Sequence, residues 1–149
     1  MKLRLLVVGR GSRELAGFEA RFIERLKPFS DCQVVELSEG RGKQVTQRKQ
    51  EEEKQILKYA RRGFVLFDER GSLHTSLQWA DYLGRQAGDV QQDFVIGGAD
   101  GVSDVVRSRA AVCWSLSKLT LPHQLVRAVV LEQMYRAFTI IQGHPYHRV

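Results

Sequence analysis

The fold is decided by Trp114-Ser-Leu-Ser-Lys-Leu-Thr-Leu-Pro-His-Gln-Leu-Val-Arg127 and the apolar run that follows it, Ala128 to Ile141. This pattern predicts a short buried strand, a loop with an apolar lip, and a long helix that begins at Pro122, because proline suits the first turn of a helix. Three valines near the helix start widen its apolar face almost all the way round, so we expect the start to be enclosed on several sides. A loop that leads into such a helix is suited to line a ligand site. The apolar face consists of Leu131, Met134, Tyr135, Phe138 and Ile141.

Strand and helix patterns alternate along the rest of the chain. Apolar runs bounded by glycines and polar turns predict the strands, and apolar side chains at helical spacing predict the helices. This order predicts one α/β domain over residues 1–149, with a parallel sheet of five strands wrapped by helices. The expected strands are 3–8, 32–37, 63–68, one that starts at 94, and 113–119, and the helices before the last one are 14–26, 44–62, 75–87 and 102–112.

The composition is that of an ordinary globular protein. Of the 149 residues, 43% are hydrophobic and 27% are charged, which excludes a disordered or fibrous chain. The net charge of +6 favours an anionic partner, of which nucleic acid is the commonest, although surplus lysine and arginine also occur on merely solvated faces. Cys32 and Cys113 each lie in an apolar run, so we expect buried thiols in a reducing compartment, not a disulfide or a nucleophile.

The amino-terminal run does not have the pattern of a targeting segment. Met1 to Gly9 is apolar for too few residues to be a signal peptide, and Arg4 interrupts it. No apolar run approaches the roughly 18 residues that a membrane span needs. We therefore expect a cytoplasmic protein without a membrane partner.

A polar loop at 38–43 and the front of the helix after it are basic. They contain Arg41, Lys43, Arg48 and Lys49. One interpretation is a solvated helix with ion pairs between residues four apart. The other is a basic edge that binds phosphates. The sequence leaves both open.

Three loops are expected at the carboxyl ends of strands, where open α/β sheets bind ligands: residues 67–71, 97–101 and 116–121. Glycine lets a ligand approach the backbone, and the leucines of the third loop suit a planar ring such as adenine. Gly97-Gly-Ala-Asp-Gly101 is neither the dinucleotide fingerprint nor a Walker A motif. The alternative role of each glycine turn is to close a corner between strand and helix.

The tail Gly143-His-Pro-Tyr-His-Arg-Val149 is the second unusual feature. Its two histidines have no cysteine or carboxylate beside them, so no metal site is predicted. A tyrosine, two imidazoles and an arginine are suited to a splayed RNA base and its phosphate, while a frayed terminus is the alternative. His123 is expected to cap or pack. No serine or cysteine has the His and Asp partners of a hydrolase.

Several ordered motifs follow one another along the chain: Met1 to Gly9, Gly40-Arg-Gly-Lys43, Ile96-Gly-Gly-Ala-Asp-Gly-Val-Ser103, Trp114 to His123, Val126-Arg127, Glu132-Gln-Met-Tyr-Arg-Ala137 and His144-Pro-Tyr-His-Arg148. Together they resemble the bacterial large-subunit rRNA methyltransferase H family, and the resemblance covers the whole chain. It implies a SPOUT-class methyltransferase, whose C-terminal segment threads a trefoil knot and which works as a homodimer. Such enzymes use S-adenosylmethionine to methylate N3 of a pseudouridine in the intersubunit-bridge stem-loop of 23S rRNA, on the assembled 70S ribosome. The knot rests on the resemblance alone, because knots are rare.

The resemblance also assigns site residues by position. The family's usual Pro-Glu after the paired glycines is Ala99-Asp100 here, and its usual leucine at the third strand's end is Phe67, which could alter the adenosine pocket. We hypothesise that Tyr146 orients the base, and that Arg148 with His144 or His147 stabilises the N3 anion, in a dimer where the tail of one subunit covers the pocket of the other. The cofactor would contact Phe67, Gly97, Leu116, Ser117, Lys118, Leu119, Thr120 and Leu121.

Other residues have two interpretations each. Asp100 either acts as a base or stabilises its turn. Glu132 either acts as a base or pairs with Arg136. Arg4, Arg127 and Arg136 are candidates for phosphate contacts or for ion pairs. Two other functional classes also stay open: a non-catalytic RNA- or ribosome-binding module, and a nucleotide-binding regulatory domain. Affinity for S-adenosylmethionine separates the enzyme from both.

Overall fold

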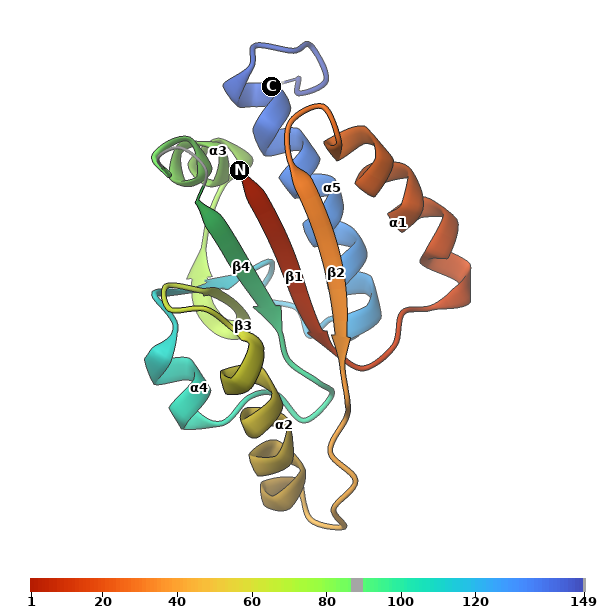
Figure 1. Ribbon diagram of the computed structural model, residues 1–149, viewed down its shortest axis with the longest axis vertical. Helices are drawn as coiled ribbons and strands as arrows, with labels where there is room; N and C mark the ends of the chain where they lie inside the picture. Colours follow the sequence, from red (N-terminus) through yellow and green to blue (C-terminus); the bar gives the residue numbers. More distant parts are fainter. Residues whose placement is uncertain (87–89, 149) are drawn as a thin grey trace.

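The computed structural model describes residues 1–86 and 90–148, in which five parallel strands form one sheet in the order β2-β1-β4-β3-β5. Helices cover both faces, and β1, β2 and β4 point toward one edge (Figure 1). The single α/β domain with a parallel five-stranded sheet is therefore confirmed. The strands are β1 Lys2–Val8, β2 Asp31–Leu37, β3 Val65–Leu73, β4 Gln91–Ile96 and β5 Val112–Ser115; the helices are α1 Arg13–Leu26, α2 Val45–Tyr59, α3 Ser76–Gly84, α4 Asp104–Arg109 and α5 His123–Ile141.

Strands β1 and β4, in the middle of the sheet, are buried on both faces, which explains their continuous apolar sequences. Because side chains alternate along a strand, Leu5 and Val7 of β1 join one core cluster, and Leu6 and Val8 join the other. The first cluster is completed by α1, α3 and α5, and the second by α2 and α4. The molecule has three layers, with the sheet in the middle.

Helix α5 is the main packing element of the larger cluster. Val130, Leu131, Met134 and Ala137 are completely buried between the sheet, α1 and α3. Its start is only partly enclosed, however, because Leu125 is 40% exposed. The expectation of a helix start enclosed on several sides is therefore met only in part by a single chain.

The end of β3 differs from the prediction. We expected the strand to end at 68 in a loop at 67–71, but β3 continues to Leu73, and its register against β5 shifts between Phe67 and Ser72. Gly71 allows this close pairing, because a Cβ at this position would lie 2.6 Å from the backbone carbon of Trp114. The prediction was wrong because a glycine that permits close strand approach has the same local sequence as one in a turn.

Three other elements, β5, α4 and α3, are shorter than expected. β5 ends at Ser115, not at 119, because the Ser115 hydroxyl donates to the Ser117 carbonyl and accepts from the Ser117 N–H, which turns the chain. Helix α4 covers only Asp104–Arg109, since Ser103 caps it. α3 ends at Gly84, and the expected end of that helix, Ala87, lies outside the described residues.

Cys32 and Cys113 are free thiols that are partly exposed, so they are less buried than predicted. Across residues 1–86 and 90–148, no helix combines the length and apolar character that a membrane span requires. The trefoil knot stays a prediction.

Candidate active site

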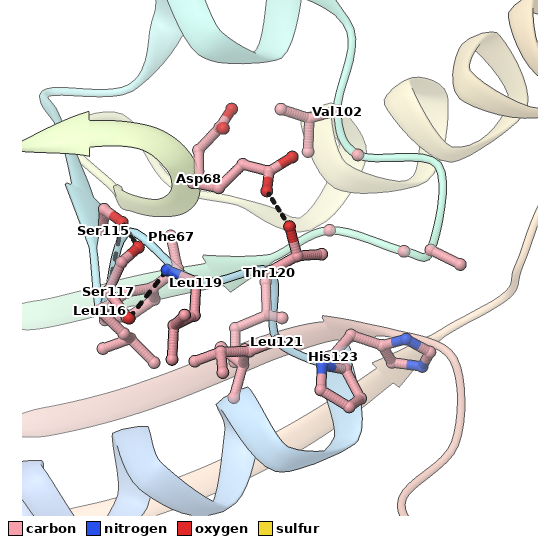
Figure 2. Close-up of a pocket in the computed structure, with 18 of the residues that line it drawn as sticks. Phe67, Asp68, Val102, Ser115, Leu116, Ser117, Leu119, Thr120, Leu121 and His123 are labelled. Atoms are coloured by element: carbon pink, nitrogen blue, oxygen red, sulfur yellow. Dashed lines mark hydrogen bonds between the residues drawn. The ribbon is translucent and has the colours of Figure 1, made fainter.

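A cavity of about 580 Å³ opens at the carboxyl edge of the sheet (Figure 2). All three predicted loops contribute to its wall: β3 with Phe67, Asp68 and Glu69, the glycine loop at residues 97–101, and the loop at 116–121. Their convergence confirms the expectation that these loops share one edge. The volume is within the usual range for small-molecule sites, about 300–1,000 Å³.

The cavity contains most of the residues that the sequence assigned to the cofactor. Lys118 is the exception, because it is exposed and is absent from the lining residues. Phe67 is also largely a core residue, stacked on Phe94 with ring centroids 5.9 Å apart. Predicted residues that line the cavity are Phe67, Gly97, Leu116, Ser117, Leu119, Thr120 and Leu121.

The inner wall is apolar and is held by serines. Ile96, Trp114 and Val126 supply apolar surface that the sequence did not assign to the site. The Ser117 hydroxyl accepts the Leu119 N–H at 2.9 Å, so this hydroxyl helps to fix the loop from within. Such a wall is suited to a planar ring stacked between aliphatic side chains.

One side of the cavity is acidic. Asp68 is neutralised, because Arg107 donates to its Oδ2 from Nε at 2.8 Å and from Nη2 at 2.7 Å. Glu69 forms no ion pair with any described residue, and its Oε2 accepts a long hydrogen bond of 3.4 Å from Thr120 (Figure 2). Its free carboxylate favours a cationic group in the cavity. The signal that the sequence analysis missed was an acidic pair directly after a buried strand.

The glycine loop has no room for larger residues at its first two positions. A Cβ on Gly97 would lie 2.6 Å from Val102 Cγ1, and one on Gly98 would lie 2.9 Å from Glu52 Oε1. Gly101 has φ +80°, which favours glycine. The loop thus presents bare backbone to the cavity, as a ligand that binds peptide groups requires.

Glu52 lies behind the glycine loop and is a buried carboxylate. Its Oε2 accepts the Gly40 N–H at 2.9 Å, whereas Oε1 has no hydrogen-bond partner among the described residues. Burial raises the pKa of Glu52 above its ordinary value, and the negative charges of Asp100 and Glu39 act in the same direction. The ionised form is therefore disfavoured in the folded protein.

We expect Glu52→Gln to stabilise the protein more at pH 7.5 than at pH 4. A raised pKa means that Glu52 contributes stability below its unfolded value of about 4.3, and that this contribution is lost as pH rises through the folded pKa. Glutamine removes the charge and keeps an acceptor for Gly40. Thermal unfolding of both proteins across this pH range tests it, and a difference in Tm that does not change with pH would contradict it.

His123 lies at the rim of the cavity, at the first position of α5. A Cβ on Gly9 would be 3.2 Å from His123 Nε2 and 2.6 Å from Glu39 Oε1, so glycine is needed where β1 ends. The imidazole packs at this corner, in agreement with its predicted packing role.

The predicted phosphate-binding arginines are engaged in ion pairs. Arg4 pairs with Asp93 at 2.6 Å, Arg127 with Glu19 at 2.7 Å, and Arg136 with Glu132 at 2.8 Å. Of the two interpretations of each arginine, the structure supports the ion pair.

The two acidic base candidates are occupied in the same way. Asp100 pairs with Arg48 at 2.7 Å, and Glu132 accepts from Arg136 at 2.8 Å.

Helix α2 was interpreted as a solvated helix with ion pairs between residues four apart. Within the described residues α2 has no such ion pair, so the interpretation was wrong in that detail.

The tail folds back along α5 as far as the middle of the helix and is not frayed. The Tyr146 hydroxyl donates to Glu132 Oε1 at 3.1 Å, and the Tyr146 ring lies 4.8 Å from that of Tyr135. Arg136 Nη1 is 3.0 Å from His147 Nδ1. Figure 1 shows this end of the chain near the amino terminus, away from the carboxyl edge of the sheet.

The structure therefore does not bring the predicted tail residues to the cavity of the same chain. His144 and Arg148 are exposed, and Tyr146 and His147 are half-buried on α5. Val149 lies outside the described residues.

A comparison with known protein families identifies the family of this chain. The profile of the family described as predicted SPOUT methyltransferases matches residues 1–147. The chain belongs to the SPOUT methyltransferase family. Family membership implies a methyl donor, which a simple nucleotide-binding regulatory domain would not use.

Relatives of this SPOUT methyltransferase match over nearly the full length. A protein of Geobacter sp. (strain M21) named ribosomal RNA large subunit methyltransferase H is 39% identical over 99% of both chains. Proteins of the same name from Agrobacterium fabrum, 39% identical over 100% of both chains, and Nitrobacter winogradskyi, 41% identical over 99% of both chains, are also similar.

Solved structures support the SPOUT methyltransferase fold. A methylase-family protein of Haemophilus influenzae matches 99% of this chain and 70% of its own, with a TM-score of 0.57 and 12% identity. A protein of Bacillus anthracis assigned to the RNA methyltransferases matches 99% of this chain and 98% of its own, with a TM-score of 0.54 and 12% identity. At this identity the likeness concerns the fold alone.

Across residues 1–86 and 90–148, no group of three or more His, Cys, Asp or Glu side chains is placed to hold a metal ion.

Proposed function

We propose that this chain uses S-adenosylmethionine to methylate N3 of a pseudouridine in the intersubunit-bridge stem-loop of 23S rRNA, on the assembled 70S ribosome in the cytoplasm. The observation that carries the proposal is the convergence of the residues assigned to the cofactor, from Phe67, Gly97 and the loop at 116–121, on one cavity. The similarity to relatives named for methylation of large-subunit rRNA supports the choice of substrate.

The residues of the cavity suit this cofactor. Backbone of the glycine loop and aliphatic side chains such as Leu116 and Leu121 would hold the adenosine, and the free carboxylate of Glu69 would attract its positive charge. When bound, S-adenosylmethionine supplies a methyl group on a sulfonium. Because charge is neutralised as the methyl moves, an apolar wall that excludes water favours the reaction, and alignment of the base contributes most of the remaining acceleration.

The tail would act on the cavity of a second copy. Helix α5 has 19 residues and therefore separates His123 at the cavity from Ile141 near the tail by roughly 28 Å. The tail folds back along α5 only as far as Glu132, midway along the helix, so about half of this gap remains within one chain. A symmetric homodimer places each tail near the partner's cavity without any new fold.

The tail residues would orient the base and stabilise its anion. N3 must lose its proton before it attacks the methyl group, but Asp100 and Glu132 are already paired with arginines. The N3 proton passes to water, and we assign the anion that remains to the tail: Tyr146 orients the base, and Arg148 with His144 or His147 stabilises the N3 anion.

We expect Arg148→Ala to lower kcat for methylation of 70S ribosomes by on the order of 100-fold, because a charged donor to the anion is lost. Its affinity for S-adenosylmethionine should stay at the wild-type value, since Arg148 is far from the cavity of its own chain. Methyl transfer from labelled cofactor gives kcat, and calorimetry gives the affinity. Near-normal turnover would sink the assignment of the tail.

Mixed dimers test whether the tail acts on the partner. Arg148→Ala retains its cavity, and Gly97→Trp, which blocks the cavity, retains its tail. If the tail acts across the dimer, co-refolding the two inactive variants restores roughly a quarter of wild-type activity, because half the dimers are mixed and each has one complete site. If no activity returns, the tail does not act on the partner.

The first experiment is titration of the wild-type protein with S-adenosylmethionine, alone and in the presence of 70S ribosomes. Binding in either condition supports the enzyme. No binding in both conditions would favour the non-catalytic ribosome-binding module.

A further inference from the structure

Arg48 of α2 joins two loops that have different tasks in the proposed function. Its Nε and Nη2 donate to the two carboxylate oxygens of Asp100, in the glycine loop, at 2.7 and 3.2 Å. Its Nη1 donates to the carbonyls of Gly42 and Lys43, both at 3.1 Å. We call residues 40–43 the basic loop. One guanidinium thus fixes the position of the basic loop relative to a wall of the cavity.

The same helix fixes the peptide groups of the basic loop from the other side. Glu51 Oε2 accepts the N–H groups of Arg41 at 2.6 Å and Gly42 at 3.3 Å, and Glu52 Oε2 accepts that of Gly40 at 2.9 Å. Both the N–H and the C=O groups of this loop are therefore bound by side chains of α2. The loop has a defined shape that depends on this helix.

The helix also contacts the glycine loop and its continuation at two further points. A Cβ on Gly98 would lie 2.9 Å from Glu52 Oε1, and the Ser103 hydroxyl donates to Glu53 Oε1 at 2.5 Å. A shift of the glycine loop therefore requires a shift of the α2 side chains that hold the basic loop.

The side chains of the basic loop are available to a ligand. Arg41 and Lys43 are exposed, and neither forms an ion pair within residues 1–86 and 90–148. Figure 1 shows the segment between β2 and α2 extending beyond the carboxyl edge of the sheet, the edge at which the cavity opens. Two free cations at this edge suit the phosphates of a bound RNA strand.

We propose that Arg48 is a positioning residue that couples the two loops, so that cofactor binding at the glycine loop strengthens the binding of RNA phosphates at the basic loop. The inference rests on the proposed function. Coupling between two sites is reciprocal, so RNA also strengthens cofactor binding by the same factor.

The test compares the affinity of the protein for 70S ribosomes with and without saturating S-adenosylhomocysteine. We expect the wild-type affinity to rise on the order of fivefold with the ligand. Arg48→Met should bring this ratio close to one. Arg48→Lys keeps the positive charge but lacks the planar fork that reaches Asp100 and both carbonyls, so its ratio should also be close to one.

Two controls separate coupling from charge and from stability. Arg41→Ala combined with Lys43→Ala should weaken ribosome binding under both conditions and leave the ratio unchanged. Arg4→Met removes an equivalent fork on Asp93, with bonds of 2.9 and 2.6 Å at the opposite edge of the sheet, and should lower Tm without changing the ratio. The same low ratio in Arg4→Met and Arg48→Met would show a general structural effect and overturn the inference.

The results for the wild-type protein separate a failure of the coupling inference from a failure of the proposed function. If wild type binds S-adenosylhomocysteine but its ratio is one, or if Arg48→Met keeps the wild-type ratio, the inference fails and the proposed function stands. If wild type binds neither S-adenosylmethionine nor S-adenosylhomocysteine, alone or with ribosomes, the proposed function fails, and the inference fails with it.

Discussion

Gly97→Trp is expected to abolish binding of S-adenosylmethionine, with a loss of affinity of at least about 100-fold. Even a Cβ on Gly97 would lie 2.6 Å from Val102 Cγ1, and Val102 is itself 5% exposed and has little room to move. The indole must therefore occupy the cavity, where it takes the volume that the cofactor needs. A loss of this size corresponds to roughly 2.7 kcal/mol or more of binding free energy.

The measurement is calorimetric titration of both proteins with S-adenosylmethionine. Gly17→Trp is a matched control, because a Cβ on Gly17 has no neighbour within 4 Å and α1 does not line the cavity. It should bind as wild type does. Gly97→Ala should give an intermediate loss, since its methyl group displaces Val102 but does not fill the cavity. Wild-type affinity in a folded Gly97→Trp protein would show that the cofactor binds elsewhere.

Arg127→Met is expected to lower the free energy of unfolding by about 3–5 kcal/mol. Arg127 donates from Nε to Glu19 and from Nη1 to Glu36, both at 2.7 Å, so it connects α5 with α1 and β2. The Glu19 side chain is only 5% exposed, and methionine would leave its charge buried without a partner. Removing one member of a buried pair costs more than the pair itself contributes.

Urea unfolding of wild type and variant measures this loss. Arg85→Met is the matched control, because its ion pair with Asp81 is 78% and 61% exposed and should contribute less than about 1 kcal/mol. Adding Glu19→Gln to Arg127→Met removes the stranded charge and should recover part of the stability. If the single variant at 127 unfolds like wild type, the buried pair has no structural role.

The order of the elements was predictable because it depends on local patterns. Continuous apolar runs gave the parallel strands, and the spacing of the apolar face of α5 gave its length to within one residue at the start, since Pro122 caps the helix instead of beginning it. The boundaries at β3 and β5 were not predictable. The end of β3 depends on Gly71 packing against β5, a contact between distant parts of the chain. The end of β5 depends on the hydroxyl of Ser115, which bonds a residue only two positions away but has no counterpart in the pattern of apolar residues.

The site shows the same division. Strand order and glycine content were enough to expect three converging loops, and the resemblance added the residues of the loop at 116–121. The partners of the arginines could not be predicted, because Arg127 and Glu19 are 108 positions apart in the chain. The separation of the tail from the cavity also depends on the direction in which the chain folds back after α5, which no local spacing encodes.

Helix α5 lies between the cavity and the tail, so its length sets the distance and the rotation between them. Each residue inserted between its ends would move the tail by about 1.5 Å and rotate it by about 100° about the helix axis. Substitutions of similar size on its buried face keep the position and the rotation of the tail. A single insertion changes the position and the rotation together. Under the proposed function, the length of α5 is therefore more tightly constrained than its sequence.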